Sequence, residues 1–175
     1  MTPLPPGLRS GAARRAKDDV IVWRLERSIY APTWHMGEGA FQVGGRWSPP
    51  GRRVVYCALD PSTAILEVAV HKGFKVLDMV PHQLLRIRIA QPAKAHVLDV
   101  STVPNNAWLR PGVVSAGQQA FGDELLARHP LVVVPSVVSR HSWNLLIDVA
   151  GACGTFETAG VEEFELDGRL HPAGK

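Results

Sequence analysis

The sequence predicts one α+β domain built from mixed, mainly antiparallel β-sheets with a few short helices. Apolar, β-branched runs of strand length recur along the chain and are bounded by turn residues. Helix signals are confined to two stretches, 60–73 and 113–128. Strands and helices do not alternate regularly, and no segment repeats, so the pattern favours neither a doubly wound parallel sheet nor a solenoid.

The strands are predicted from composition and alternation. The run DVIVWRLE at 19–26 is a first strand that carries Arg24 among apolar residues. HQLLRIRIA at 82–90 alternates apolar and basic residues, as a half-buried antiparallel strand does, and AHVLDVS at 95–101 is expected to be its short partner. The other expected strands are RRVVYCAL at 52–59, PLVVVPSVVS at 130–139, SWNLLIDVA at 142–150 and GVEEFELDGRL at 160–170.

The helix over 60–73 has clear ends. Asp60 is a candidate N-cap, Pro61 occupies the first helical position and Gly73 follows the last turn, which leaves Glu67 in the middle. The preceding segment, RSIYAPTWHMGEGAFQVGG at 27–45, contains four glycines and no sustained period. It is predicted to be an irregular loop that packs aromatic side chains.

Length and composition indicate a single folded domain with short tails. The 175 residues are 46% hydrophobic and 20% charged, which is typical of a globular protein. Residues 1–17 carry prolines, glycines and basic residues without a periodic apolar face and are predicted to be a flexible tail. The domain is expected over 18–170, with a C-terminal tail at 171–175.

Several classes of function receive no support. The net charge of +3 comes mostly from the basic N-terminal stretch, so direct binding of nucleic acid is not expected. Two cysteines without a CxxC pair and scattered histidines give no metal site. The sequence shows neither a signal peptide nor an apolar membrane span, so the expected location is the cytoplasm.

Four polar residues stand in apolar or glycine-rich surroundings where burial of a charge or hydroxyl would be costly. They are Arg24, Arg46, Glu67 and Ser136. Each has an ordinary explanation as an exposed residue or a turn cap. Together, however, they suggest side chains that meet one another or face a ligand cleft.

These residue types suit a nucleotide. An arginine fork grips phosphate oxygens, and adjacent glycines allow close approach of the backbone. A glutamate can bond ribose hydroxyls and stabilise an oxocarbenium-like centre, while Tyr56 or Trp47 could stack on a planar base. No dinucleotide-binding GxGxxG, P-loop or serine-hydrolase elbow is present.

Four blocks in order carry a resemblance to a known family. They are VWR near the start, GGRWSPPGRRVVYCA, STAILEVAVH and VVPSVVSRHSWNLLID. The chain resembles the RES domain, the toxin half of bacterial RES–Xre type II toxin–antitoxin systems, over about residues 20–170. Two positions depart from the family pattern, which usually has Asn where this chain has Ser48 and often Asn-Pro where it has Asp148-Val149.

The resemblance implies a fold similar to mono-ADP-ribosyltransferases and an enzyme that uses NAD as substrate, with no other cofactor and no metal. By this resemblance the catalytic residues are Arg24, Tyr56, Glu67 and Ser136. The nucleotide-binding residues are Arg24, Gly45, Arg46, Trp47, Tyr56 and Asn144. Gly44 and Gly45 are expected to bring the backbone near the phosphates that Arg46 binds, and Trp47 to wall the pocket or act only as a core residue.

The implied activity is cleavage of the nicotinamide–ribose bond of NAD by hydrolysis, phosphorolysis or ADP-ribosyl transfer. The implied partner is a Xre-like helix-turn-helix antitoxin whose C-terminal segment enters the cleft, and the complex could contain a homodimer. The sequence leaves open which acceptor is used and which arginine meets the pyrophosphate. It also leaves open a catalytically inactive module that binds a partner through the same cleft.

Overall fold

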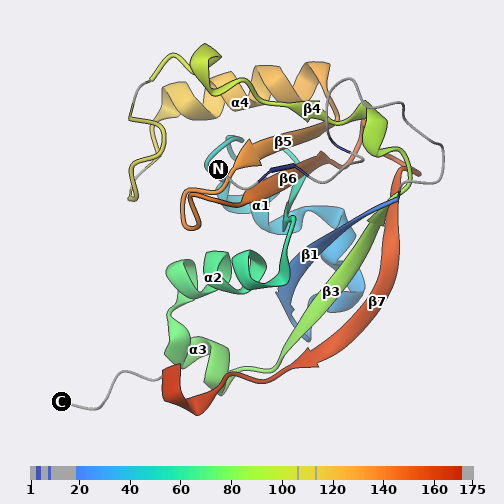
Figure 1. Cartoon of the computed structure of the whole chain (residues 1–175), viewed down its shortest axis with the longest axis vertical. Helices are drawn as coiled ribbons and strands as arrows, with labels where there is room; N and C mark the ends of the chain where they lie inside the picture. The colour runs from blue at the N-terminus through green and yellow to red at the C-terminus, as the bar shows by residue number, and fades with distance from the viewer. Residues whose placement is uncertain (1–2, 5–7, 9–18, 106, 113, 171–175) are drawn as a thin grey trace.

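The computed structural model describes residues 3–4, 8, 19–105, 107–112 and 114–170 (Figure 1). Their seven strands form one sheet in the order β4-β5-β6-β2-β1-β3-β7, in which only the β4–β5 pair is parallel. The α+β class with a mainly antiparallel sheet and short helices is therefore confirmed. The strands are β1 (Val20–Arg27), β2 (Val54–Ala58), β3 (His82–Ile89), β4 (His96–Val97), β5 (Leu131–Pro135), β6 (Trp143–Asp148) and β7 (Phe156–Phe164).

The helices are short and lie between the strands. The two longest are α2 (Pro61–Lys72) and α4 (Ala116–Arg128), which confirms both predicted helices with small changes at the ends. The described chain also contains α1 (Glu38–Val43), α3 (Phe74–Met79) and the 3₁₀ turns η2 (Ala31–Met36), η3 (Pro92–Lys94), η4 (Val100–Thr102) and η5 (Gly168–Leu170).

Two local predictions were wrong, and the closing strand expected at 160–170 lies instead at Phe156–Phe164, with η5 after it. The segment 27–45 is not an irregular loop, because it contains η2 and α1, each only six residues long and separated by Gly37 at φ 63°. Helices of this length are too short to show a period in the sequence. The segment 95–101 does not pair with β3: its strand β4 pairs in parallel with β5, and the next residue, Leu98, is buried.

The sheet is strongly bent between β1 and β2. These strands are joined by the single register pair Trp23–Ala58, whereas β1 pairs with β3 along its whole length. Figure 1 shows β1, β3 and β7 turning away from β5 and β6. At the bend, Nη1 of Arg24 donates to the backbone oxygen of Tyr56 at 2.8 Å, so a side chain partly replaces strand pairing.

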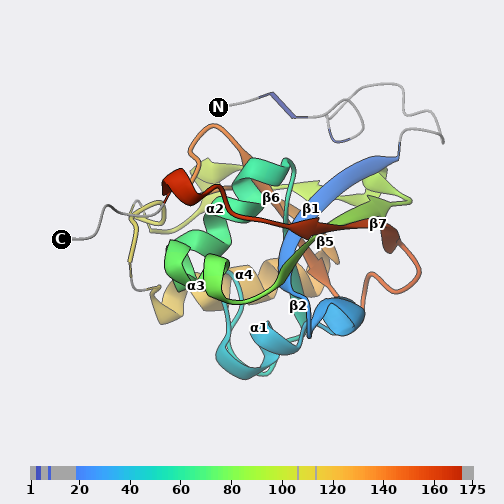
Figure 2. The same ribbon diagram turned by 90° about the horizontal axis from the view of Figure 1, so that it is seen from below.

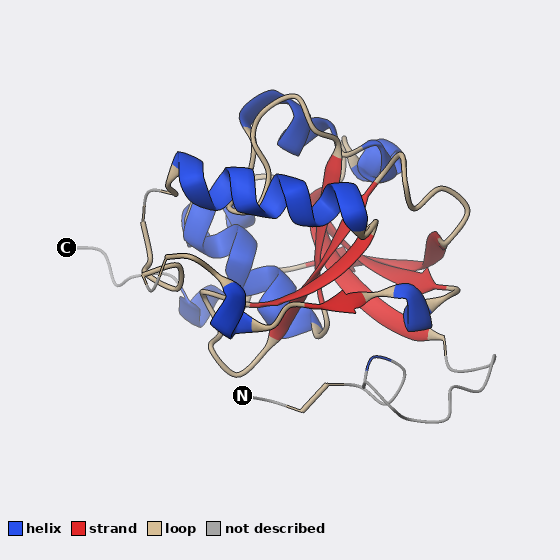
Figure 3. Cartoon of the chain, turned by 90° about the horizontal axis from the view of Figure 1, so that it is seen from above, coloured by secondary structure: helices blue, strands red, loops and turns tan. Residues whose placement is uncertain are grey.

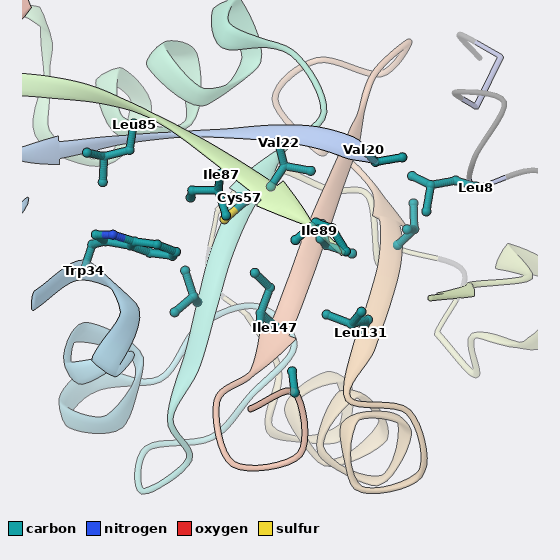
Figure 4. Close-up of a cluster of buried hydrophobic side chains, with 14 of the residues drawn as sticks. Leu8, Val20, Val22, Trp34, Cys57, Leu85, Ile87, Ile89, Leu131 and Ile147 are labelled. Atoms are coloured by element: carbon teal, nitrogen blue, oxygen red, sulfur yellow. The ribbon is translucent and has the colours of Figure 1, made fainter. Parts of the chain in front are cut away.

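The largest core fills the space between the two halves of the bent sheet. Figure 4 shows Val22, Leu85 and Ile87 of one half facing Cys57 and Ile147 of the other. Burying such aliphatic side chains is worth about 1.5–3 kcal/mol each, which holds the halves together. Both cysteines are free thiols, and Cys57 belongs to this core.

Two further cores attach the helices. One packs Leu125 and Leu126 of α4 against Val132 and Val134 of β5, and Figure 3 shows α4 lying across the sheet. The other packs α2 and α3 against the opposite half through Leu25, Ala69 and Leu77, and Figure 2 shows these two helices next to each other. Helix α2 therefore has a fixed place beside the bend.

Residues 1–17 and 171–175, which were predicted as tails, lie outside the described residues except for positions 3, 4 and 8. Leu8 has an exposed fraction of only 3% and belongs to the core between the sheet halves, near Val20 (Figure 4). Leu4 packs against the same cluster.

Gly122 tests the contact between α4 and the turn before β2. A Cβ atom at Gly122 would lie 2.2 Å from the backbone oxygen of Trp47, whereas one at Gly117 in the same helix would meet nothing within 4 Å. Gly122→Ala is expected to lower the free energy of unfolding by about 2 kcal/mol or more, since backbone must move to admit the methyl group. Gly117→Ala should leave it unchanged or raise it slightly. Urea unfolding measures both, and equal stabilities would contradict the contact.

The two thiols should react very differently. Burial raises the pKa of the Cys57 thiol to about 12, although the charge of Arg24 acts in the opposite direction, whereas Cys153 is exposed. We expect iodoacetamide at pH 8 to modify Cys153 in the native protein and Cys57 only after unfolding. Peptide mass spectrometry identifies the modified residue, and rapid native labelling of Cys57 would contradict its position in the core.

Candidate active site

Glu67 lies in the middle of α2, and the start of that helix is fixed by its cap. The carboxylate of Asp60 accepts hydrogen bonds from the backbone N–H and the hydroxyl of Thr63, both at 2.8 Å. The hydroxyl of Ser142, which directly precedes β6, also bonds Asp60. The cap thus joins the first turn of α2 to the beginning of β6.

The carboxylate of Glu67 points toward the adjacent ends of β5 and β6. Its Oε1 atom accepts a hydrogen bond from Oγ of Ser136 at 2.8 Å and another from Nδ2 of Asn144 at 2.7 Å. Both donors are neutral, so they hold the carboxylate in place without cancelling its charge. Among the described residues, no hydrogen bond reaches Oε2, which is left for another donor.

The two donors are held in fixed orientations. Ser136 is fully buried, and its Oγ also accepts from the backbone N–H of Ser139 at 3.0 Å, so its one proton is directed to Glu67. Asn144 must present its NH₂ group to a carboxylate, which only accepts. Its Oδ1 is therefore turned away, and that atom is buried with no hydrogen-bond partner in the described structure.

Tyr56 lies on β2, and its hydroxyl is bonded to the glycine-rich turn. Its Oη accepts from the backbone N–H of Trp47 at 3.2 Å and shares a 2.9 Å hydrogen bond with Oγ of Ser48. Burial raises the pKa of Tyr56, while these hydrogen bonds and the charge of Arg46 act to lower it. A Cβ atom at Gly45 would lie 2.4 Å from the phenol oxygen, so glycine is required there.

Arg46 extends from the same turn and is close enough to Glu67 for their charges to interact. Its Nη1 donates to the backbone oxygens of Trp108 at 3.2 Å and Arg110 at 3.4 Å. Burial lowers the pKa of Arg46, and its electrostatic interactions with Glu67 first and then with Tyr56 act to raise it. The structure thus brings this guanidinium and the carboxylate of Glu67 to one region.

Two predicted site residues have structural neighbours that change how they are interpreted. Trp47 is 2% exposed and packs against Trp108 and Phe121, so its ring supports the site from the core and offers no open face for stacking. Trp47 is therefore a core residue here, which corrects the expectation that it stacks on a base.

Arg24 directs Nε and Nη2 to the carboxylate of Glu26 and Nη1 to the Tyr56 carbonyl.

The predicted residues therefore fall into two groups. Glu67, Ser136 and Asn144 are joined directly by hydrogen bonds, with Arg46 and Tyr56 beside them, whereas Arg24 reaches this group through the backbone of Tyr56. Two residues that contact this group were not predicted from the sequence. Ser48 bonds Tyr56, and Nε2 of Gln119 donates to the Gly45 oxygen at 2.9 Å. No motif marks Gln119, because its partner is a backbone atom.

Asp148, the second departure from the family pattern, serves the fold. Its carboxylate pairs with Arg52 at 3.0 Å and accepts from the backbone N–H of Gly151. Arg52 also pairs with Asp123 of α4 at 2.9 Å. These bonds connect the end of β6 to the turn before β2 and to α4.

A cavity of about 340 Å³ opens between the start of α2 and the β5–β6 turn. On the α2 side the lining includes Thr63, one helical turn before Glu67, and Leu66, the residue directly before it. On the other side it includes Ser139 and His141 of the β5–β6 turn. The cavity gives a small molecule room beside the Glu67 helix.

The described residues contain no cluster of three or more histidine, cysteine or acidic side chains arranged for a metal ion. Within the same part of the chain, none of the helices has both the length and the apolar character needed to cross a membrane.

Comparison with known proteins assigns the family. The model of the RES domain matches residues 21–167. A "Toxin Res" of Photorhabdus laumondii subsp. laumondii is 36% identical over 131 residues, covering 74% of this chain and 81% of that protein. A "Toxin Res" of Pseudomonas putida is 30% identical over 151 residues, covering 86% and 99%.

The fold is also found in a solved structure. A chain in the crystal structure of the M. tuberculosis MbcT–MbcA toxin–antitoxin complex superimposes with a TM-score of 0.66, covering 84% of this chain and 85% of that one. The identity is 21%, so this likeness concerns the fold. With the family model matched over most of its length and two curated relatives at 30% identity or more, the chain belongs to the RES domain family.

Proposed function

We propose that this protein is the toxin of a toxin–antitoxin pair and that it breaks the nicotinamide–ribose bond of NAD. The observation that carries the proposal is the Glu67 carboxylate, which is held by Ser136 and Asn144 beside Arg46. A carboxylate held by two neutral donors keeps its negative charge, and such a charge suits a reaction in which positive charge develops on a sugar.

In the proposed reaction the bond between ribose C1′ and the nicotinamide nitrogen breaks, and its electron pair leaves with nicotinamide. The remaining ribose cation is stabilised by Glu67 and then captured by a nucleophile on the opposite side. The nucleophile forms a new bond to C1′ and can be water, inorganic phosphate or a protein side chain. Water and a side chain lose a proton when they bond, whereas phosphate bonds through one of its oxygens.

The contacts of Glu67 divide its two oxygens between separate tasks. Ser136 and Asn144 both bond Oε1, which fixes the carboxylate, and Oε2 is available to a ribose hydroxyl. The unpaired Oδ1 of Asn144 supports its expected contact with the nucleotide. A buried acceptor without a donor costs about 1–3 kcal/mol, and a hydroxyl or amide of the bound nucleotide would remove that cost.

The surroundings of the arginines favour Arg46 as the pyrophosphate ligand. Every donor-bearing group of Arg24 that the structure describes is already bonded to Glu26 or to Tyr56, whereas Arg46 uses only Nη1. Arg24 then acts mainly by holding the strand that carries Tyr56. Tyr56 lies beside the nicotinamide in this proposal, and Gly45 allows its hydroxyl to approach the turn.

The toxin role is supported by the curated relatives, both described as "Toxin Res", and by the toxin–antitoxin complex that shares the fold. In the proposal the antitoxin is a Xre-like helix-turn-helix protein that blocks the cleft with its C-terminal segment. Cytoplasmic NAD is then consumed only when the antitoxin is lost.

Replacing Glu67 by glutamine is the central test. Gln keeps the size of the side chain but removes the charge, so Glu67→Gln should reduce the release of nicotinamide from NAD by about 100-fold or more. Glu124→Gln, an exposed position on α4, is the matched control and should keep the wild-type rate. Purified proteins are compared by liquid chromatography of the products, with and without phosphate, and by circular dichroism. NAD consumption by folded Glu67→Gln at the wild-type rate would refute the catalytic role.

Expression in bacteria tests the role of the Glu67 charge independently, through growth and the level of cellular NAD. We expect the wild-type chain, produced without an antitoxin, to stop growth and to lower cellular NAD, whereas Glu67→Gln permits growth. A partner-binding module without catalysis would give a different result, because growth would then respond equally to the two proteins while NAD stays constant.

Asn144→Asp should move the pH dependence of the reaction. A second carboxylate next to Glu67 disfavours ionisation of the pair, so a proton is retained there at a higher pH than in the wild type. Because the proposed role needs an ionised Glu67, activity should be lost at a higher pH on acidification than in the wild type. Asn105→Asp, an exposed control, should give the wild-type profile. Coincident profiles for wild type and Asn144→Asp would contradict the need for that charge.

A further inference from the structure

A second cavity lies beside the β5–β6 turn. It measures about 330 Å³ and is lined by Ala107, Leu109 and Arg110 of the loop before α4 and by Arg140 of the β5–β6 turn. We call it the arginine cavity. The loop and the turn lie on the same side of the molecule in Figure 1, left of the sheet.

Both walls of the arginine cavity are bonded to the candidate active site. Arg46 donates to the backbone oxygens of Trp108 and Arg110, which ties down the first wall. The second wall is tied by Ser139, whose N–H donates to the Ser136 hydroxyl that bonds Glu67. The cavity is therefore a neighbour of the reacting centre, held by the residues that form it.

The charge of the arginine cavity is not neutralised. Within the described residues, the side chains of Arg110 and Arg140 have no hydrogen bond or ion pair, and no acidic residue lines the cavity. Other arginines do pair with carboxylates: Arg24, Arg52, Arg53, Arg86, Arg88 and Arg169. Two arginines without a carboxylate partner line this cavity, and Arg46 is bonded to the backbone of one of them, so positive charge is locally in excess.

From this arrangement we propose that the arginine cavity binds a phosphate group, with Arg110 and Arg140 as its ligands. Guanidinium groups match the oxygens of phosphate in pairs and remain charged at all physiological pH values. A water molecule occupies about 30 Å³ in the liquid, so the cavity has space for a phosphate or pyrophosphate together with waters. The other two lining residues, Ala107 and Leu109, are apolar, so the charged contacts would come from the two arginines.

The phosphate group has two possible sources. Both follow from the proposed function, and the identification of the ligand rests on that function. It could belong to the nucleotide, with the pyrophosphate extending from Arg46 to Arg110 and Arg140. Alternatively, it could be free inorganic phosphate that enters beside the nucleotide as the acceptor. The chemistry of recognition is the same, and a binding experiment separates the two sources.

The test is isothermal titration of the full chain with ADP-ribose and, separately, with inorganic phosphate. The variants are Arg110→Gln, Arg140→Gln and both together, and Arg128→Gln on α4 is the control with the same change of charge. Arg128 is exposed and does not line the arginine cavity. Both substituted positions are exposed, so the fold should persist, and thermal unfolding checks this.

The double variant should bind its phosphate ligand about tenfold or more weakly than the wild type, whereas Arg128→Gln stays within about twofold. A loss confined to ADP-ribose identifies the nucleotide as the source, and a loss confined to inorganic phosphate identifies the free ion. If neither affinity changes by more than about twofold, or if Arg128→Gln loses as much as the double variant, the arginine cavity is not a phosphate site.

These titrations require no turnover, so their outcome is separate from that of the proposed function. A wild-type chain that leaves NAD intact would refute NAD cleavage and would still report whether the two arginines bind phosphate. Conversely, an active enzyme whose double variant binds both probes normally would refute only the arginine cavity.

Discussion

The hydrogen bonds from Ser136 and Asn144 to one oxygen of Glu67 are the interaction on which the rest of the site depends. Helix α2 packs on β1 and β3, whereas Ser136 directly follows β5 and Asn144 lies in β6, in the other half of the sheet. A partly buried carboxylate is stable only when neighbouring groups donate to it. The same bonds therefore join two parts of the fold and orient the group expected to act on the substrate. A structural change in either part would alter the position of the Glu67 carboxylate.

The bend in the sheet makes this meeting possible. If β1 paired with β2 along its length, the two halves would continue as one surface, and α2 would lie farther from the end of β5. Pairing at a single position lets the sheet turn, and Arg24 compensates by bonding a strand carbonyl. Arg24, a polar residue in an apolar strand, thus takes part in the contact between the two halves of the sheet. Its ion pair with Glu26 keeps the charge balanced.

Local signals in the sequence were sufficient for some elements and not for others. The ends of α2 were predictable because Asp60, Pro61 and Gly73 act on their own neighbours. The pairing of β4 with β5 was not, since it depends on contacts between distant segments that no local pattern records. Among the site residues, Glu67 and Ser136 could be found as polar groups in apolar runs, but their bond to each other is a property of the fold. For Trp47 the sequence could not distinguish two roles, because a tryptophan beside glycine and arginine has the same local pattern in a pocket wall and in a core.

Leu8 shows that the folded unit does not start where the composition changes. The proline-rich and basic character of the first residues sets a boundary near residue 18, yet Leu8 fills a place in the core beside Val20 with only 3% of its surface exposed. A shortened protein that starts at the compositional boundary would lose this side chain and present a fresh apolar surface to water, a common cause of aggregation. Affinity tags and fusion partners are therefore better joined ahead of this leucine than in place of it.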